Sequence, residues 1–263
     1  MGGRVIIHTA SDIRALKGTR RLATLTAYDY PMALALDQVG LDVILVGDSL
    51  GEVELGYDST RAVTLEMMAH HVRAVANGAT RTHICGDMPA GSYADPRQAV
   101  ASAMTLVSAG AHSVKLEGAL IPQVGAIIDA GIPVMGHVGL LPQTAEGGYR
   151  KQGKTTQDAD RLVAEATALD RAGCFAIVIE CVHAEAARRI TAAVGAPTIG
   201  IAAGIDCDGQ VLVSTDLIGL LPDRPAFVAP RANVRDIIMG AAAEFAAEVR
   251  TTKSEPAARS TQR

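Results

Sequence analysis

The stretch DVILVGDSLG, residues 42–51, places four consecutive apolar residues shortly before a carboxylate, Asp48. A short continuous apolar run is typical of a parallel strand that is covered on both faces. The same arrangement, an apolar run that closes on an acidic residue, recurs at ICGD (84–87), VKLE (114–117) and IVIE (177–180). Because four predicted strands end in the same way, these acidic residues require a common structural explanation.

Outward from this stretch, short apolar segments alternate with longer segments of helical period. The predicted strands are 23–28, 42–47, 82–86, 113–117, 133–138, 175–180, 197–202 and 226–230. The predicted helices are 11–18, 64–77, 95–110, 157–173, 184–195 and 233–249. Eight strands with intervening helices in a chain of 263 residues predict an α/β fold, a (β/α)₈ TIM barrel. An open doubly wound sheet is the alternative, and it is less favoured because no G-x-G-x-x-G motif follows the first strand.

Composition limits the classes of function. The net charge is −4 with both signs well mixed, so no basic surface for nucleic acid is expected. No apolar stretch is long enough to span a membrane, and the N-terminal residues lack the pattern of a signal peptide. The four cysteines include no C-x-x-C pair, which is typical of reduced, buried thiols. We therefore expect a soluble, cytoplasmic protein with one barrel domain, residues 1–250, and a disordered tail, residues 251–263.

The acidic strand ends predict a site. In a barrel of this type the carboxyl ends of all strands meet at one mouth, where the active site lies. We therefore expect Asp48, Asp87, Glu117 and Glu180 to be neighbours in space. Several carboxylates at one mouth repel each other unless a cation relieves them, and oxygen ligands suit Mg²⁺. Lys115 shares a strand face with Glu117 and is a candidate clamp for an anionic substrate oxygen.

Each of these residues also has a structural interpretation. A single strand-end Asp is more often a helix cap or a loop acceptor, and only the combination with a lysine favours a metal-dependent enzyme. His137, after the apolar core of the fifth strand, is either a contact for substrate or a polar residue satisfied within the mouth. The Gly-rich basic segment 146–155 is either a lid or a plain solvated loop.

Nine strings, in order along residues 10–220, resemble the ketopantoate hydroxymethyltransferase family. They are TAYDYPMA, VGDSLG, LGYDST, GDMPAGSY, VKLEG, GHVGLLPQT, GGYRKQGKT, ECVHAE and DCDGQVLV. The resemblance implies a barrel of the isocitrate lyase/phosphoenolpyruvate mutase-like group that forms homo-oligomers, commonly decamers. It also implies transfer of a hydroxymethyl group from 5,10-methylenetetrahydrofolate to 3-methyl-2-oxobutanoate, through a Mg²⁺-stabilised enolate, to give 2-dehydropantoate for pantothenate biosynthesis.

The matching motifs imply a role for each residue. Asp48 and Asp87 match metal ligands that also meet the substrate, and Glu117 matches a third metal-site carboxylate that acts through water. Ser49 and Lys115 match groups that hold the keto acid, whereas His137 is a candidate substrate contact by its position alone. Glu180 matches the catalytic proton acceptor.

The sequence departs from the family pattern at positions outside these predicted ligands and the base. The departing residues are Arg61, Ala62, Ala90, Ala202 (where the family's GIGAG reads GIAAG), Thr215 and Ala226. They motivate one alternative, a divergent metal-dependent 2-oxo acid aldolase or lyase. A non-catalytic oligomeric barrel scaffold is a further alternative, which loss of Glu180 or of either aspartate would suggest, and all three residues are present.

Overall fold

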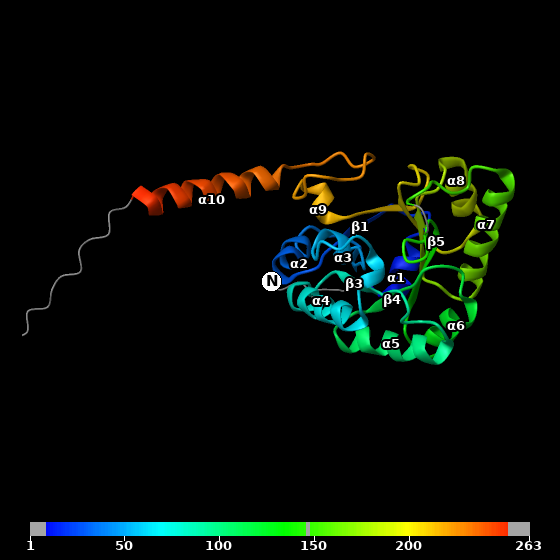
Figure 1. Cartoon of the computed structure of the whole chain (residues 1–263). Helices are drawn as coiled ribbons and strands as arrows, with labels where there is room; N and C mark the ends of the chain where they lie inside the picture. Colours follow the sequence, from blue (N-terminus) through cyan, green and yellow to red (C-terminus); the bar gives the residue numbers. More distant parts are fainter. Residues whose placement is uncertain (1–8, 146–147, 252–263) are drawn as a thin grey trace, which may run out of the picture. The chain divides into compact units, whose positions relative to one another are not determined.

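Eight parallel strands form a closed barrel in the computed structural model, which describes residues 9–145 and 148–251 (Figure 1). The strands are β1 Leu22–Thr26, β2 Val43–Val46, β3 His83–Asp87, β4 Ser113–Lys115, β5 Val134–Gly139, β6 Ala176–Glu180, β7 Thr198–Ile201 and β8 Gly209–Leu212. Neighbours in sequence are neighbours in the sheet, and β1 pairs with β8 to close it. The predicted TIM barrel is confirmed, and the closure excludes an open doubly wound sheet.

Helices lie between most of the strands. They are α1 Ala10–Ala15, α2 Tyr30–Leu36, α3 Leu50–Val53, the 3₁₀ helix η1 Thr60–Ala62, α4 Leu65–Gly78, α5 Pro96–Ser108, α6 Ile121–Asp129, α7 Thr156–Arg171, α8 Ala184–Ala193, α9 Ser214–Leu217 and α10 Val234–Thr251. Each predicted helical segment overlaps one of them, with bounds that differ by a few residues. The side chain of Asp95 caps α5 by accepting from the backbone N–H of Arg97 and Gln98, at 2.9 and 3.0 Å.

The prediction of an eighth strand at 226–230 is wrong. That segment forms turns and coil, bounded by Pro225 and Pro230, and Phe227 is 51% exposed. The eighth strand is instead Gly209–Leu212. Its sequence, GQVL, lacks a continuous apolar run because it begins with Gly209 and Gln210. Gly209 is required there because a Cβ would lie 2.6 Å from the carbonyl oxygen of Leu22, on the strand that closes the barrel.

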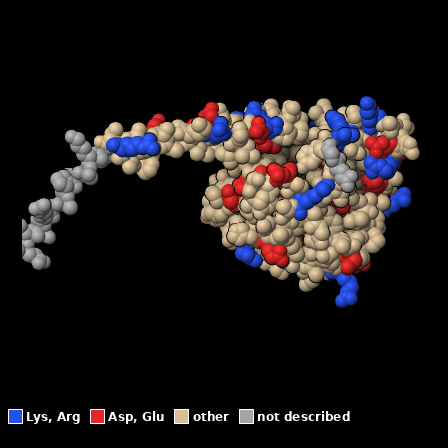
Figure 2. All heavy atoms as spheres, in the orientation of Figure 1, with Lys and Arg blue, Asp and Glu red and all other residues tan. Residues whose placement is uncertain are grey.

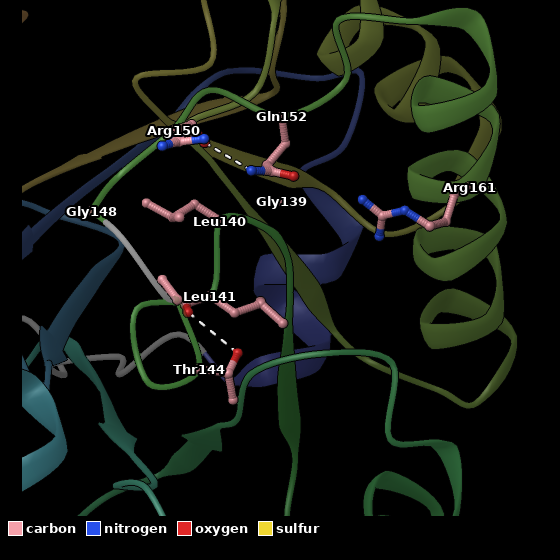
Figure 3. Close-up of a pocket in the computed structure, with 9 residues that line it drawn as sticks. Gly139, Leu140, Leu141, Thr144, Gly148, Arg150, Gln152 and Arg161 are labelled. Carbon is pink, nitrogen blue, oxygen red and sulfur yellow. Dashed lines mark hydrogen bonds between the residues drawn. The ribbon is translucent and has the colours of Figure 1, made fainter.

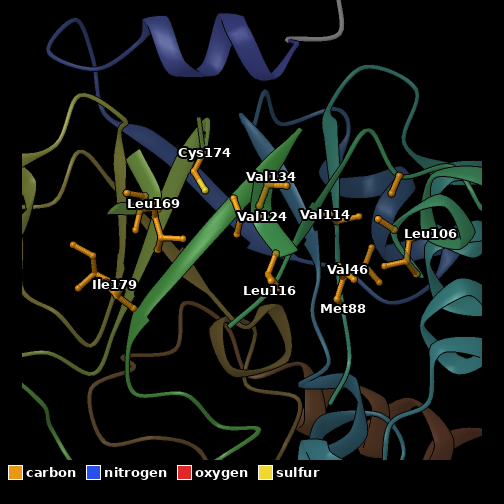
Figure 4. Close-up of a cluster of buried hydrophobic side chains, with 14 of the residues drawn as sticks. Val46, Met88, Leu106, Val114, Leu116, Val124, Val134, Leu169, Cys174 and Ile179 are labelled. Atoms are coloured by element: carbon orange, nitrogen blue, oxygen red, sulfur yellow. The ribbon is translucent and has the colours of Figure 1, made fainter. Parts of the chain in front are cut away.

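Both faces of the strands are buried, which explains the continuous apolar runs. Along β2, Val43 and Leu45 belong to the core inside the barrel, while Ile44 and Val46 belong to the layer between the sheet and its helices. Figure 4 shows part of that outer layer, with Leu106 of α5 among its members. Full burial of one such aliphatic side chain contributes about 1.5–3 kcal/mol, so this layer is a principal source of stability.

The chain divides into two compact units, residues 1–214 and 215–263, and every strand lies in the first. A single domain over residues 1–250 stays a prediction. The predicted tail, residues 251–263, lies outside the described residues apart from Thr251, the last residue of α10.

The state of the cysteines and the distribution of surface charge agree with what the composition predicts. All four cysteines are free, and Cys85, Cys174 and Cys207 are buried. Acidic and basic side chains are interspersed over the face of the first unit that Figure 2 shows. In the described parts of the chain, no helix has both the length and the apolar character that crossing a bilayer requires.

Candidate active site

Strand periodicity brings the predicted site residues to one end of the barrel interior. Side chains two residues apart on a strand point to the same face of the sheet. Four residues of the predicted site each follow, by two positions, a residue whose side chain faces the barrel interior. The pairs are Cys85 and Asp87 on β3, Ser113 and Lys115 on β4, Met135 and His137 on β5, and Val178 and Glu180 on β6. The register pairs Asp87 directly with Lys115. These side chains therefore form the layer above the interior core, at the carboxyl ends of the strands.

Asp48 and Asp87 are a pair of buried carboxylates, 5% and 2% exposed. Asp48 follows β2 after Gly47, and its backbone N–H donates to Oδ2 of Asp87 at 3.5 Å. Burial, followed by the charge of Asp87, raises the pKa of Asp48 to about 7. The prediction that these two residues, 39 positions apart in the chain, meet at one mouth is in accord with this contact.

Lys115 is the cation of the cluster. Its Nζ donates to Oδ1 of Asp87 at 2.7 Å, and both side chains are almost fully buried. Burial alone would lower the pKa of Lys115, but the charges of Asp87, Glu117 and Asp48 outweigh it and raise the pKa. The ammonium is therefore a fixed positive charge inside the mouth.

Gln143, in the loop after β5, ties the carboxylates together. Its Nε2 donates to Oδ2 of Asp48 at 2.8 Å and to the carbonyl oxygen of Met88 at 2.9 Å, and its backbone N–H donates to Oε2 of Glu117 at 3.1 Å. Its side-chain oxygen accepts from the hydroxyl of Tyr93. Sequence reasoning did not assign this residue, although it lies within the string GHVGLLPQT.

Glu117 lies two residues beyond the end of β4 and is 4% exposed. Burial, opposed by Lys115 and reinforced by the charge of Asp48, raises its pKa to about 9. Its Oε1 lies 3.9 Å from Nδ1 of His137. Glu117 is therefore part of the same electrostatic cluster as the two aspartates.

His137 connects Lys115 with Glu180. Its Nδ1 accepts from Nζ of Lys115 at 3.5 Å, and its Nε2 lies 3.3 Å from Oε2 of Glu180. Burial, with Lys115 acting in the same direction, lowers the pKa of His137, so the ring is neutral near pH 7 and carries its proton on Nε2. That nitrogen is buried and lacks a well-aligned hydrogen bond. The imidazole N–H therefore lies within reach of the 24%-exposed carboxylate of Glu180, its nearest acidic partner.

Ser49 is only partly exposed and is held in place by a buried tyrosine. Its Oγ lies 2.8 Å from the hydroxyl of Tyr28, which is 2% exposed. A Cβ at Gly47 would approach Oγ of Ser49 to 2.9 Å, so a larger residue there would shift this hydroxyl from its present position. Tyr28 is another contact that sequence reasoning did not single out, although it lies in the string TAYDYPMA.

The donor set fits a hard divalent cation held by two carboxylates. Within the described residues, no group of three or more His, Cys, Asp and Glu side chains is arranged to hold a metal ion. Mg²⁺ in enzymes is often held by only one or two carboxylates and keeps water or substrate oxygens in its other positions. The buried pair Asp48 and Asp87, whose mutual repulsion raises the pKa of Asp48, is a donor set of this kind.

Comparison with known proteins identifies a family. Residues 7–255 match the model of the family described as ketopantoate hydroxymethyltransferase. Proteins named 3-methyl-2-oxobutanoate hydroxymethyltransferase are similar to this chain: that of Oleidesulfovibrio alaskensis is 50% identical over 92% of this chain and 86% of its own length. That of Ignicoccus hospitalis is also 50% identical, over 92% of this chain and 95% of its own length.

Solved structures show the same fold at low sequence identity. A phosphoenolpyruvate phosphomutase from Streptomyces platensis has a TM-score of 0.62 at 14% identity, covering 92% of this chain and 88% of its own. A 2,3-dimethylmalate lyase of the PEP mutase/isocitrate lyase superfamily has a TM-score of 0.60 at 16% identity, covering 97% and 93%. At these identities the likeness shows the fold alone, the (β/α)₈ barrel.

Proposed function

The chain belongs to the ketopantoate hydroxymethyltransferase family, and we propose that it makes 2-dehydropantoate for pantothenate biosynthesis. The reaction would transfer a hydroxymethyl group from 5,10-methylenetetrahydrofolate to 3-methyl-2-oxobutanoate. The observation that carries this proposal is the convergence of two buried aspartates, a buried lysine and a glutamate at one end of the barrel interior. An enolising enzyme needs these groups: anionic ligands for a cation, a fixed positive charge and a base.

Asp48 and Asp87 would hold Mg²⁺, with Glu117 acting on it through water. When bound there, Mg²⁺ supplies a Lewis acid for the carboxylate and keto oxygens of the substrate. The chain's own groups complete the site: Lys115 stabilises negative charge that develops on the keto oxygen, and the hydroxyl of Ser49 donates to the bound acid.

Glu180 would be the base that takes the proton from C3 of the keto acid. It is the most exposed of the four acidic residues, so its carboxylate faces the space that substrate would enter. The neutral His137, whose Nε2 lies 3.3 Å from Oε2 of Glu180, would orient that carboxylate. The carbon nucleophile formed in this way would form a C–C bond to the one-carbon unit of the folate. Water would supply the hydroxyl oxygen of the hydroxymethyl group, and tetrahydrofolate would leave as both C–N bonds to that carbon break.

A homo-oligomer in the cytoplasm completes the proposal, a decamer if the chain follows the family pattern. Support comes from α10, an 18-residue helix on which no residue is buried. Its exposed apolar residues include Ile237 (67%), Phe245 (67%) and Val249 (58%). An apolar helix surface of this kind marks an interaction site.

Solvent-deuterium exchange at C3 of 3-methyl-2-oxobutanoate tests the proposal. We expect exchange that needs Mg²⁺ but no folate, and product formation only when the folate donor is added. Glu180→Gln should abolish exchange and leave binding of the keto acid intact. Glu185→Gln is the matched control, because that carboxylate is exposed and pairs with Arg188 at 2.6 Å.

Three outcomes contradict the proposal in different ways. Full exchange in Glu180→Gln removes Glu180 as the base. Cleavage or addition without folate favours the 2-oxo acid aldolase or lyase. No exchange by the wild-type protein under any condition favours the scaffold.

A further inference from the structure

A pocket lies at the carboxyl end of β5, where the loop after this strand approaches α7. It has a volume of about 290 Å³. In Figure 3, Leu140 and Leu141 lie on one side, and Arg150, Gln152 and Arg161 approach from the others. The pocket therefore combines an apolar wall with two guanidinium groups, a composition that suits an anion attached to an apolar body.

The two arginines differ in how they are held. The guanidinium of Arg161 donates to the carboxylates of Asp158 and Glu165, each at 2.6 Å, and these bonds fix its position. Three of its five N–H donors take no part in these two bonds. The guanidinium of Arg150 has no carboxylate partner among the described residues, and the residue is exposed. Arg150 is therefore a cation available to a carboxylate ligand.

The loop that lines this pocket also builds the active site. Within Leu140–Ala145, Gln143 points to Asp48, while Leu141, Thr144 and Ala145 line the pocket. The backbone N–H of Leu140 donates to the carbonyl oxygen of Glu180 at 2.8 Å. Gly139, which also lines the pocket, pairs with Glu180 in the sheet, so the pocket lies next to the proposed base.

The family departure at Arg61 acts on the same loop. The guanidinium of Arg61 donates to the carbonyl oxygen of Ala145, which lines the pocket. Across the mouth, the hydroxyl of Tyr149 donates to Oε1 of Glu52 at 3.1 Å. These two contacts hold the chain at Ala145, which lines the pocket, and at Tyr149, between the lining residues Gly148 and Arg150.

We propose that this pocket binds the p-aminobenzoyl-glutamate tail of the one-carbon donor, with its carboxylates on Arg150 and Arg161 and its ring against Leu141. The inference rests on the proposed function, because a tetrahydrofolate donor carries its one-carbon unit on the pterin and its two carboxylates at the far end. When the pterin faces Glu180, the tail must leave the mouth. The adjoining pocket supplies an apolar wall, the guanidinium of Arg150, and the N–H donors of Arg161 that its two carboxylate partners leave open.

Calorimetry with p-aminobenzoyl-glutamate tests the pocket without any turnover. We expect the full chain to bind this probe, and to bind 4-aminobenzamide, which lacks the glutamate, at least tenfold more weakly. Arg150→Gln should weaken the probe by about 10- to 100-fold, since a charge-assisted hydrogen bond contributes about 1.5–3 kcal/mol. Lys151→Gln is the matched control, because Lys151 is the next basic residue of the loop and does not line the pocket; it should bind as the wild type does.

A kinetic measurement provides the second readout. Arg150→Gln should raise KM for the folate donor with little change in KM for the keto acid, and Arg150→Lys should recover part of the loss. Equal affinity of wild type and Arg150→Gln for the probe would overturn the pocket assignment. That result would leave the proposed function standing if wild-type deuterium exchange is normal. Absence of exchange and of turnover in the wild type would remove the proposed function instead.

Discussion

Gln143 and Asp48, 95 residues apart in the chain, are joined by a hydrogen bond of 2.8 Å from Nε2 to Oδ2. Because Asp48 is buried, this amide is one of the few groups that stabilise its charge. Gln143→Ala should weaken binding of the keto acid with Mg²⁺ by about 10- to 100-fold, since a hydrogen bond to a charged group contributes about 1.5–3 kcal/mol. Calorimetry would measure the loss, and undiminished affinity would contradict this role.

Gln123→Ala is the control for that experiment. Gln123 is a partly buried glutamine whose amide makes only long hydrogen bonds, 3.4 and 3.5 Å, to backbone carbonyls of Ala94 and Tyr93. Its loss should leave the affinity for the keto acid unchanged.

Asp87 is expected to link the metal with the keto acid. Asp87→Asn keeps the size of the side chain and an acceptor for Lys115 but removes one of two carboxylate ligands. We expect Mg²⁺ to raise the thermal midpoint of the wild type and to have little effect on the variant, and the affinity for the keto acid to fall by at least tenfold. Asp58→Asn, at an exposed aspartate, should behave as the wild type. Normal affinity for the keto acid in Asp87→Asn would show that the acid binds without this ligand.

Asp37 governs stability rather than catalysis. Its carboxylate accepts from the backbone N–H of Thr80, Arg81 and Thr82 at 2.8–3.1 Å, which ties the end of α2 to the start of β3. Burial alone would raise the pKa of Asp37, but these hydrogen bonds outweigh it and lower the pKa. A lowered folded pKa stabilises the fold above the unfolded value, about 3.9, and this contribution is lost as the pH falls through the folded pKa.

Asp37→Asn should therefore reduce the free energy of unfolding at pH 7 by about 1–3 kcal/mol. The difference from the wild type should shrink as the pH falls below about 4. Urea denaturation at several pH values would measure both effects, with the exposed Asp129→Asn as the control. A difference that is independent of pH would show that the charge of Asp37 is not the cause.

Ala202 adopts a strained backbone where the family string GIGAG has glycine. Its φ is 53°, in the left-handed region that alanine enters at a cost of roughly 1–2 kcal/mol. Ala202→Gly should therefore stabilise the fold by about 1 kcal/mol, after the entropy that glycine loses on folding. The neighbouring Ala203, 1% exposed and outside the left-handed region, provides the opposite control, because Ala203→Gly should destabilise. A lower urea midpoint for Ala202→Gly would contradict the strain.

The strand pattern was sufficient to predict seven of the eight strands and the convergence of the acidic residues. A parallel strand buried on both faces is recognisable in the sequence as a continuous apolar run. Side chains alternate between the two faces along each strand, and Asp87 of β3 pairs with Lys115 of β4, so these two side chains lie on the same face. The eighth strand is not predicted correctly, because Gly209 and Gln210 make it less apolar than residues 226–230. The role of Gln143 is not predictable in this way, because it lies in a loop. Side chains in a loop do not alternate with a fixed period, so the sequence does not show which way Gln143 points.

Closure of the sheet between β1 and β8 has a consequence for how the protein is made. Leu22 pairs with Gly209, so the first strand obtains its second neighbour only when the last one has left the ribosome. At synthesis rates of about 5–20 residues per second, the edge of β1 waits roughly 10 to 40 s for that partner. During this interval a partly formed sheet has two open strand edges, which can pair with other chains.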